Sequence, residues 1–93
     1  MSAVVWLWEW RAPDGRVILK GDYLARPTAS PADIAAERVA LLVHVKLQRN
    51  THVAPAEALA DMAGMVCRVW REDDPDNWAD ERADEWIRTA RAA

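Results

Sequence analysis

The sequence predicts an α+β fold in which an N-terminal two-stranded antiparallel hairpin packs with three α-helices, in the order β-β-α-α-α. The strand prediction rests on residues 4–11, where Trp6, Trp8 and Trp10 recur at two-residue spacing and therefore share one face of a strand. The helix prediction rests on prolines and capping residues that precede apolar residues at helical spacing. With 93 residues, 52% of them hydrophobic, the chain is expected to form a single domain over residues 1–93.

A turn signal separates the two strands of the hairpin. We expect the first strand from about Ala3 to Arg11 and the second from about Arg16 to Leu24. The residues between them read Ala-Pro-Asp-Gly, in which proline has the φ of the second turn position and glycine readily adopts a positive φ. The segment is therefore predicted to be a tight β-turn.

The length of this loop decides which residues lie opposite the tryptophans, and two registers are open. A three-residue loop with a glycine bulge places Ala12 opposite Arg16. It then places Trp10, Trp8 and Trp6 opposite Ile18, Lys20 and Asp22. A two-residue loop instead places the same indoles opposite Leu19, Gly21 and Tyr23. Because the two-residue loop needs a backbone donor where Pro13 has none, we favour the three-residue register, in which Lys20 contacts the Trp8 ring.

The first helix is expected to run from Pro31 to Arg49 or Asn50. Ser30 is a good N-cap, and a proline fits the first helical position. The apolar residues spread around much of the circumference, which predicts a central helix with neighbours on two sides. Residues 43–48 also alternate like a strand, but we interpret them as part of the helix.

Two further helices are expected. The second covers about residues 55–71, with apolar residues on one face and Gly64 as its weak point. The third covers about residues 75–91 and follows Asp74 as its N-cap. A third strand, at residues 43–48 or 65–70, stays open as an alternative.

Residues 57–65 read Glu-Ala-Leu-Ala-Asp-Met-Ala-Gly-Met and resemble the first helix and turn of the helix-turn-helix family. The resemblance implies DNA binding, with Arg68 and Arg71 on the recognition helix. The acidic residues that follow, Asp73, Asp74 and Asp76, would repel phosphates. We therefore favour one continuous amphipathic helix and keep a DNA-binding regulatory protein as the alternative function.

Charge and composition restrict the binding partners and the cellular location that we expect for the chain. The net charge of −3 gives no general attraction to nucleic acid. A single cysteine cannot form an internal disulfide, the first apolar run stops at Glu9, and no stretch approaches the ~20 apolar residues of a membrane span. We expect a cytoplasmic protein. The excess of Ala, Arg, Asp and Trp is typical of high-GC genes, such as those of actinobacteria or their phages.

No catalytic, metal or cofactor motif stands out. Cys67 is remote in sequence from His44 and His52, and the two histidines do not have zinc spacing. Three glycines are too few for a phosphate-binding loop to be expected. The acidic run at residues 73–85 does not alternate as a calcium loop does and is expected to be a solvated helix face. We expect no enzymatic activity, no metal and no cofactor.

The tryptophan ladder has three interpretations: a core that replaces the missing Phe, a surface for self-association, or a surface for a foreign protein. An exposed ladder would approach the largest apolar patch that monomers tolerate. As function we expect a small protein-interaction module that binds a second copy of itself, or a host or other partner protein, through the tryptophan face or the acidic third helix. The candidate partner-binding residues are Trp6, Trp8, Trp10, Lys20, Asp80 and Asp84.

Overall fold

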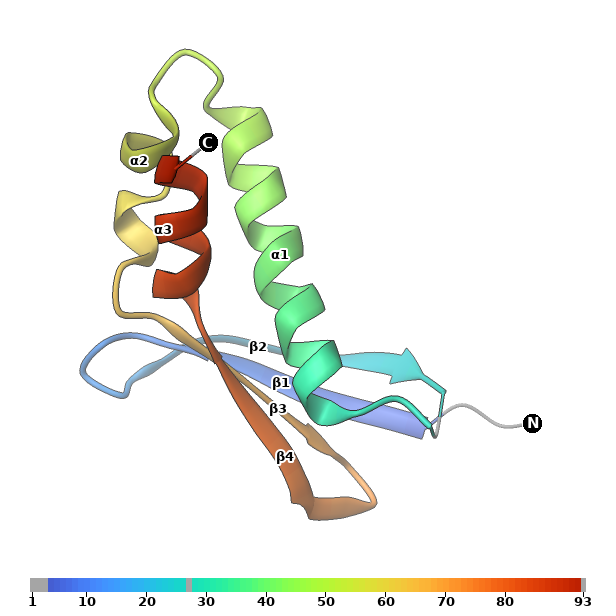
Figure 1. Cartoon of the computed structure of the whole chain (residues 1–93). Helices are drawn as coiled ribbons and strands as arrows, with labels where there is room; N and C mark the ends of the chain where they lie inside the picture. Colours follow the sequence, from blue (N-terminus) through green and yellow to red (C-terminus); the bar gives the residue numbers. More distant parts are fainter. Residues whose placement is uncertain (1–3, 27, 93) are drawn as a thin grey trace.

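One antiparallel sheet of four strands, with the helices on one of its faces, makes up residues 4–26 and 28–92, which the computed structural model describes (Figure 1). The elements in chain order are β1 (Val4–Arg11), β2 (Val17–Ala25), α1 (Pro31–Arg49), α2 (Pro55–Ala58), the 3₁₀ turn η1 (Ala60–Met62), β3 (Val66–Arg71), β4 (Asp74–Arg82) and α3 (Ala83–Ala92). The strand order across the sheet is β2-β1-β3-β4. The α+β class is confirmed, but β3 and β4 extend the predicted hairpin to four strands.

The loop between β1 and β2 has the three residues that the turn chemistry predicts. The N–H of Gly15 donates to the Ala12 carbonyl (2.9 Å), and the N–H of Ala12 donates to the Arg16 carbonyl (2.8 Å). Gly15 has a φ of +89°, so the loop is a type I turn followed by a left-handed glycine. The predicted strand start at Ala3 lies outside the described residues.

A β-bulge directly after this loop overturns the register that the sequence favoured. Arg11 lies opposite Val17, but Trp10 lies opposite Leu19, so Ile18 is an extra residue on β2. Beyond the bulge the pairs are Trp10–Leu19, Trp8–Gly21 and Trp6–Tyr23. The predicted pairs of the indoles with Ile18, Lys20 and Asp22 are therefore wrong, because one inserted residue reverses the facing of every residue beyond it.

The first helix is confirmed as α1. Its N-cap is Ser30, whose Oγ accepts a hydrogen bond from the Asp33 N–H (3.1 Å), and a proline occupies its first turn. The helix ends at Arg49, so residues 43–48 are helical and the strand alternative does not apply to them. One face of α1 is buried through Ile34, Ala35, Val39 and Val43.

The predicted second helix is wrong beyond Ala58. Two short helical turns, α2 and η1, are followed by Gly64 with a φ of +76°, and residues 66–71 then form β3. Positive φ ends a helix, and the alternating residues that follow fit a central strand. The strand alternative for residues 65–70 is thus the correct one. Arg68 and Arg71 lie on β3, so the second helix of a helix-turn-helix motif does not form.

The predicted third helix is wrong in its first half. Residues 74–82 form β4, which pairs with β3 from Arg71↔Asp74 to Val66↔Arg82, and only residues 83–92 are helical. A strand next to β3 gives backbone hydrogen bonds that a separate helix cannot, so sheet pairing overrides the local helical pattern. Pro75 is compatible with β4 because this strand lies at the edge of the sheet.

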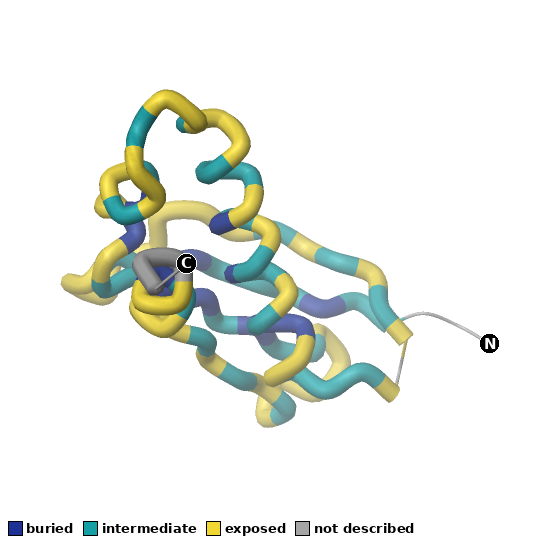
Figure 2. Tube along the Cα trace, turned by 45° about the horizontal axis from the view of Figure 1, so that its top comes forward, coloured by how far each residue is buried: buried dark blue, intermediate teal, exposed yellow. Residues whose placement is uncertain are grey.

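The core lies between the helices and the tryptophan side of the sheet (Figure 2). Trp6 and Trp10 are buried, with 0% and 4% of their surface exposed. They pack in one cluster with buried residues of β3, α1 and α3, among them Val69, Val39 and Ile87. Of the sheet's two faces, this is the one that the helices of residues 4–26 and 28–92 cover, as Figure 1 shows.

Replacing Gly64 by alanine should destabilise the fold more than the same change at Gly15. Both glycines have positive φ, which costs alanine about 1–2 kcal/mol. A Cβ on Gly64 would in addition lie 2.8 Å from Pro13 Cγ, whereas a Cβ on Gly15 would meet nothing within 4 Å. Denaturant unfolding of both variants measures the two losses, with Gly15→Ala as the control for backbone strain alone. Equal losses would contradict the close approach to Pro13.

Candidate functional site

The structure places Trp6 and Trp10 of the tryptophan ladder in the core and Trp8 at its edge. Trp6 and Trp10 have almost no exposed surface, so neither side chain is accessible in this fold. Trp8 is half-buried and lies against Gly21, where an added Cβ would come within 2.5 Å of its ring. Its Nε1 donates to the Asp22 carbonyl (3.3 Å). The tryptophan face, which we expected from the sequence to bind a partner, is thus largely covered by the chain's own helices.

The cation over the Trp8 ring comes from a helix and not from Lys20. The guanidinium of Arg38, on α1, lies 5.5 Å from the centre of the Trp8 ring and 4.3 Å from that of Tyr23. Arg38 therefore covers the edge of the core with a cation–π contact to two rings. Lys20, opposite Glu9, points to the other side of the sheet together with alternate residues of all four strands. We call this uncovered side the open face.

An apolar row crosses the open face. Leu7 on β1 lies opposite Trp70 on β3, and Trp70 lies opposite Trp78 on β4. Trp70 is half-buried and Trp78 is 50% exposed, although both are large apolar side chains. Leu24 on β2, 67% exposed, adds to the apolar surface near this row. We call Leu7, Trp70 and Trp78 the apolar row.

A second row, directly beside the first, consists of charges that alternate in sign. It runs from β2 to β4 through Lys20, Glu9, Arg68 and Asp80. We call these four residues the charge row. Two of the residues proposed from the sequence, Lys20 and Asp80, lie at its two ends.

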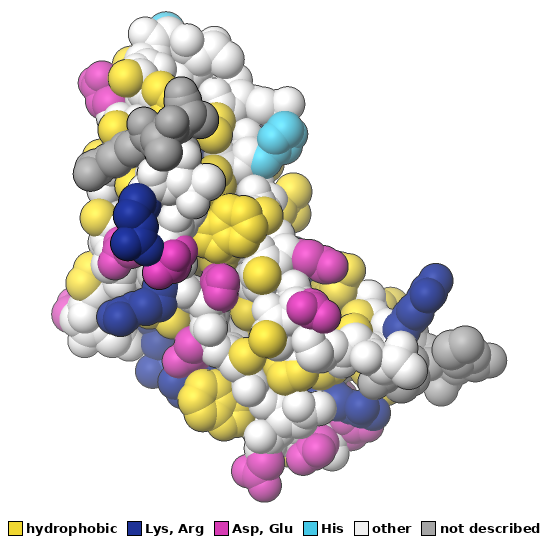
Figure 3. All heavy atoms as spheres, viewed as in Figure 1, with side chains coloured by type: hydrophobic (Ala, Val, Ile, Leu, Met, Phe, Trp, Pro, Cys, Tyr) yellow, Lys and Arg dark blue, Asp and Glu magenta, His cyan; other side chains and the backbone are white. Residues whose placement is uncertain are grey.

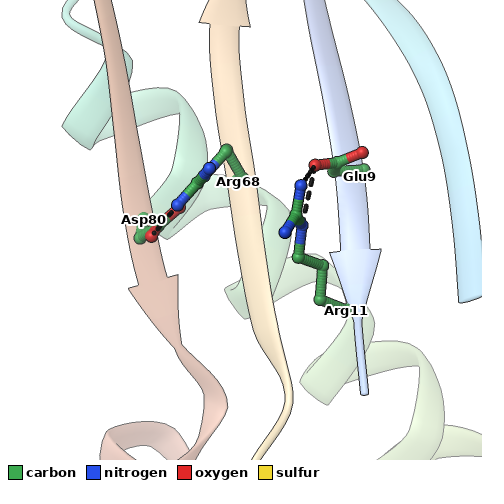
Figure 4. Close-up of polar contacts among 4 residues, drawn as sticks. All are labelled: Glu9, Arg11, Arg68 and Asp80. Atoms are coloured by element: carbon green, nitrogen blue, oxygen red, sulfur yellow. Dashed lines mark hydrogen bonds and ion pairs between the residues drawn. The ribbon is translucent and has the colours of Figure 1, made fainter. Parts of the chain in front are cut away.

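The contacts of the charge row hold its central side chains in place (Figure 4). Arg68 donates two hydrogen bonds to the Asp80 carboxylate, from Nε to Oδ1 (2.8 Å) and from Nη2 to Oδ2 (2.9 Å). The same guanidinium lies 4.5 Å from the centre of the Trp78 ring. Glu9 accepts two hydrogen bonds from Arg11 (2.8 and 2.6 Å). The hydrogen bond with Asp80 raises the pKa of Arg68, because it stabilises the protonated guanidinium.

Two shallow hollows on the open face share Trp70 as a wall. One is lined by Glu9, Arg68, Trp70, Pro75 and Trp78. The other is lined by Leu7, Trp8, Lys20, Gly21, Asp22 and Trp70. Each hollow combines apolar rings with at least one basic and one acidic side chain. Such surfaces can hold an apolar side chain of a partner while polar groups at the rim orient it.

The acidic run does not form one helix face. Asp73 lies in the turn between β3 and β4, and Asp74 and Asp76 lie at the start of β4, where Figure 3 shows acidic side chains at the tip of the sheet. Arg71 pairs with Asp73 (2.6 Å), and this hydrogen bond lowers the pKa of the Asp73 carboxyl. Asp84, proposed as a partner-binding residue, accepts a hydrogen bond from the Gly64 N–H (2.9 Å) and so joins the start of α3 to the turn before β3.

Cys67 and the histidines do not form a reactive site. Cys67 is fully buried on β3, and burial raises the pKa of its thiol to about 12. A protonated, buried thiol is a poor nucleophile at neutral pH. His44 on α1 and His52 in the loop after it are both exposed. The buried Cys67 side chain is therefore separated from the surface on which the two histidines lie.

Five residues form one surface that the sequence did not predict: Leu7, Glu9, Arg68, Trp70 and Trp78. The signal that could have found the β3 residues is the alternation in residues 66–71, where Cys67 and Val69 face the core and Arg68 and Trp70 face outward. A helical interpretation of the same residues put Trp70 on the buried side. Whether residues 66–71 are given the two-residue repeat of a strand or the 3.6-residue repeat of a helix therefore decides which tryptophans are expected at the surface.

Trp6→Ala should lower the free energy of unfolding by about 3–5 kcal/mol, because it leaves a large cavity in a packed core. Trp78→Ala should lower it by less than about 1 kcal/mol, because half of that side chain is already exposed. Denaturant unfolding of dilute protein compares the two variants. A larger loss for Trp78→Ala than for Trp6→Ala would mean that the two faces of the sheet are assigned the wrong way round.

The buried thiol makes stability depend on alkaline pH. Because the folded pKa of Cys67, about 12, lies above its ordinary value of 9.0, the unfolded chain loses this proton first. The contribution of Cys67 is fully present below pH 9 and falls by about 1.4 kcal/mol per pH unit between the two pKa values. Unfolding at several pH values, for the wild type and for Cys67→Ala, measures the difference in slope. Parallel slopes would contradict the shift.

Within residues 4–26 and 28–92, no helix is both long and apolar enough to cross a membrane. The same residues contain no group of three or more His, Cys, Asp or Glu side chains that could hold a metal ion. Comparison of the chain with protein-family models, with curated proteins and with solved structures finds no match.

Proposed function

We propose that the chain is a cytoplasmic protein-interaction module that binds a protein through the open face of its sheet. The observation that carries the proposal is the apolar row, in which Leu7, Trp70 and Trp78 form a continuous strip on a face that no described helix covers. Tryptophan is the side chain most enriched at binding hot spots. Exposed apolar strips of this kind mark interaction sites more often than they occur without a role.

The strands that carry the apolar row are held rigidly by the core, which favours binding. The two central strands, β1 and β3, carry Leu7 and Trp70, and their opposite sides hold the packed core with Trp10, Cys67 and Val69. Trp78 is held from one side by the guanidinium of Arg68, which is itself fixed by Asp80. A preorganised surface loses little conformational entropy on association. The open face therefore has both the side chains and the rigidity of an interface.

A protein fits this face better than a nucleic acid does. Aromatic rings on a sheet can stack with bases, but binding to a phosphate backbone needs uncompensated positive charge. On the open face Arg68 is paired with Asp80 and Arg11 with Glu9, and Asp22 lies at the end of the apolar row. A balanced set of charges around apolar rings is instead typical of a protein interface.

Photo-cross-linking in the producing cells tests the proposal. A photoreactive phenylalanine analogue in place of Trp78 should form a covalent adduct with a protein, because this position lies on the open face. The matched control carries the same analogue in place of Leu41, which is similarly exposed (53% against 50%) but lies on α1. Adducts from position 78 alone support the proposal. No protein adduct from position 78, an adduct with nucleic acid, or equal adducts from both positions would contradict it.

A further inference from the structure

We propose that the protein bound by the open face is a second copy of this chain, packed sheet against sheet about a two-fold axis that runs along the strands between β1 and β3. The proposal rests on the proposed function, because it uses the same face. It goes further in naming the occupant and the pairs of residues that meet. The product is a dimer of four layers, with helices outside and two sheets inside.

The charge row carries this inference, because it matches a second copy of itself that is turned around. From β2 to β4 the row reads positive, negative, positive, negative: Lys20, Glu9, Arg68, Asp80. A two-fold axis along the strands brings β2 of one copy over β4 of the other and β1 over β3. The order of the charges in the second copy is then reversed, so that each charged side chain faces one of opposite sign. Lys20 faces Asp80 of the second copy, and Glu9 faces Arg68 of the second copy.

The same operation brings the apolar rows together. Leu7 faces Trp70 of the second copy and Trp70 faces Leu7 of the second copy, close to the axis. Trp78 faces Asp22 of the second copy, so that the indole Nε1–H of Trp78 can donate a hydrogen bond to the Asp22 carboxylate. Apolar side chains thus meet at the centre and polar pairs lie beside them, as in known isologous interfaces.

The size of the open face is sufficient for such a dimer. Four strands about 4.8 Å apart and about eight residues long give a face of roughly 500 Å², so two copies bury about 1,000 Å² together. This area reaches the lower limit of specific interfaces. Aligned packing of two sheets through their side chains is a common arrangement. The dimer is therefore expected to be reversible and to strengthen with protein concentration.

Two charge-reversal variants test the pairing. In a dimer of Lys20→Glu, residue 20 would meet Asp80 of the second copy, and in a dimer of Asp80→Lys, residue 80 would meet Lys20 of the second copy. Each variant alone should dimerise at least about tenfold more weakly than the wild type, because two like-charge pairs form. Mixed in equal amounts, they should form a heterodimer of nearly wild-type affinity, because both cross-copy pairs are again of opposite sign.

This rescue cannot arise within one chain. Residues 20 and 80 lie on the two edge strands, about 14 Å apart across the sheet, and the two changes are on different molecules. Sedimentation measures the affinities, and native mass spectrometry identifies the heterodimer. Lys20→Glu mixed with Glu37→Lys, whose change lies on α1, is the matched control. Its heterodimer keeps one of the two like-charge pairs and should therefore stay clearly weaker than the heterodimer of Lys20→Glu with Asp80→Lys. If Asp80→Lys does not fold, a chain that carries both Lys20→Glu and Asp80→Asn replaces the mixture. This double variant should dimerise more tightly than Lys20→Glu alone, because its residue 20 no longer meets a like charge at position 80.

The outcomes separate this inference from the proposed function. Weak single variants and a restored heterodimer support the two-fold pairing. A wild type that stays monomeric at millimolar concentration, while position 78 still cross-links to another protein, overturns the second copy as occupant but leaves the interaction module in place. A dimer that neither variant weakens is formed by another surface, such as the edge of β2, and also overturns the pairing.

Discussion

Burial of Trp6 and Trp10 on β1 is the constraint on which the rest of the structure depends. β1 is a central strand, hydrogen-bonded to β2 on one side and β3 on the other, so its facing determines the facing of its neighbours. With Trp6 and Trp10 inward, Cys67 and Val69 of β3 must also face the core, and Glu9 and Arg68 must face outward. The bulge at Ile18 is the local distortion that makes the facing of β2 agree with this arrangement.

The turn around Gly64 connects this sheet to the helices. Its backbone N–H is held by Asp84 at the start of α3, and its Cα approaches Pro13 in the β1–β2 loop. Three segments distant in sequence therefore meet at one glycine. Because a side chain at this position would collide with the proline ring, the residue that weakens a helix is the one that allows the loop, β3 and α3 to pack together.

The open face follows from the same geometry. A sheet covered by helices on one side only leaves its other side to water, and most one-sided sheets present polar residues there. In this chain the outward positions hold a row of charges that alternate in sign and, beside it, a row of large apolar side chains. Trp70 and Trp78 are not part of the core cluster of the described residues, and this observation is what supports the proposed interaction surface.

The sequence by itself determined the elements whose signals are local. The hairpin turn depends on Pro13 and Gly15, and α1 depends on Ser30 and Pro31, all within a few residues of the structure that they specify. Tertiary structure decided the rest. The bulge sets the facing of β2 to match the core, β3 forms because it pairs with the distant β1, and β4 forms because it pairs with β3. Residues 66–71 carry no local signal strong enough to separate helix from strand, since backbone pairing with β1, more than fifty residues away, supplies the deciding hydrogen bonds. Residues 74–82 in turn become a strand because β3 is there to pair with them.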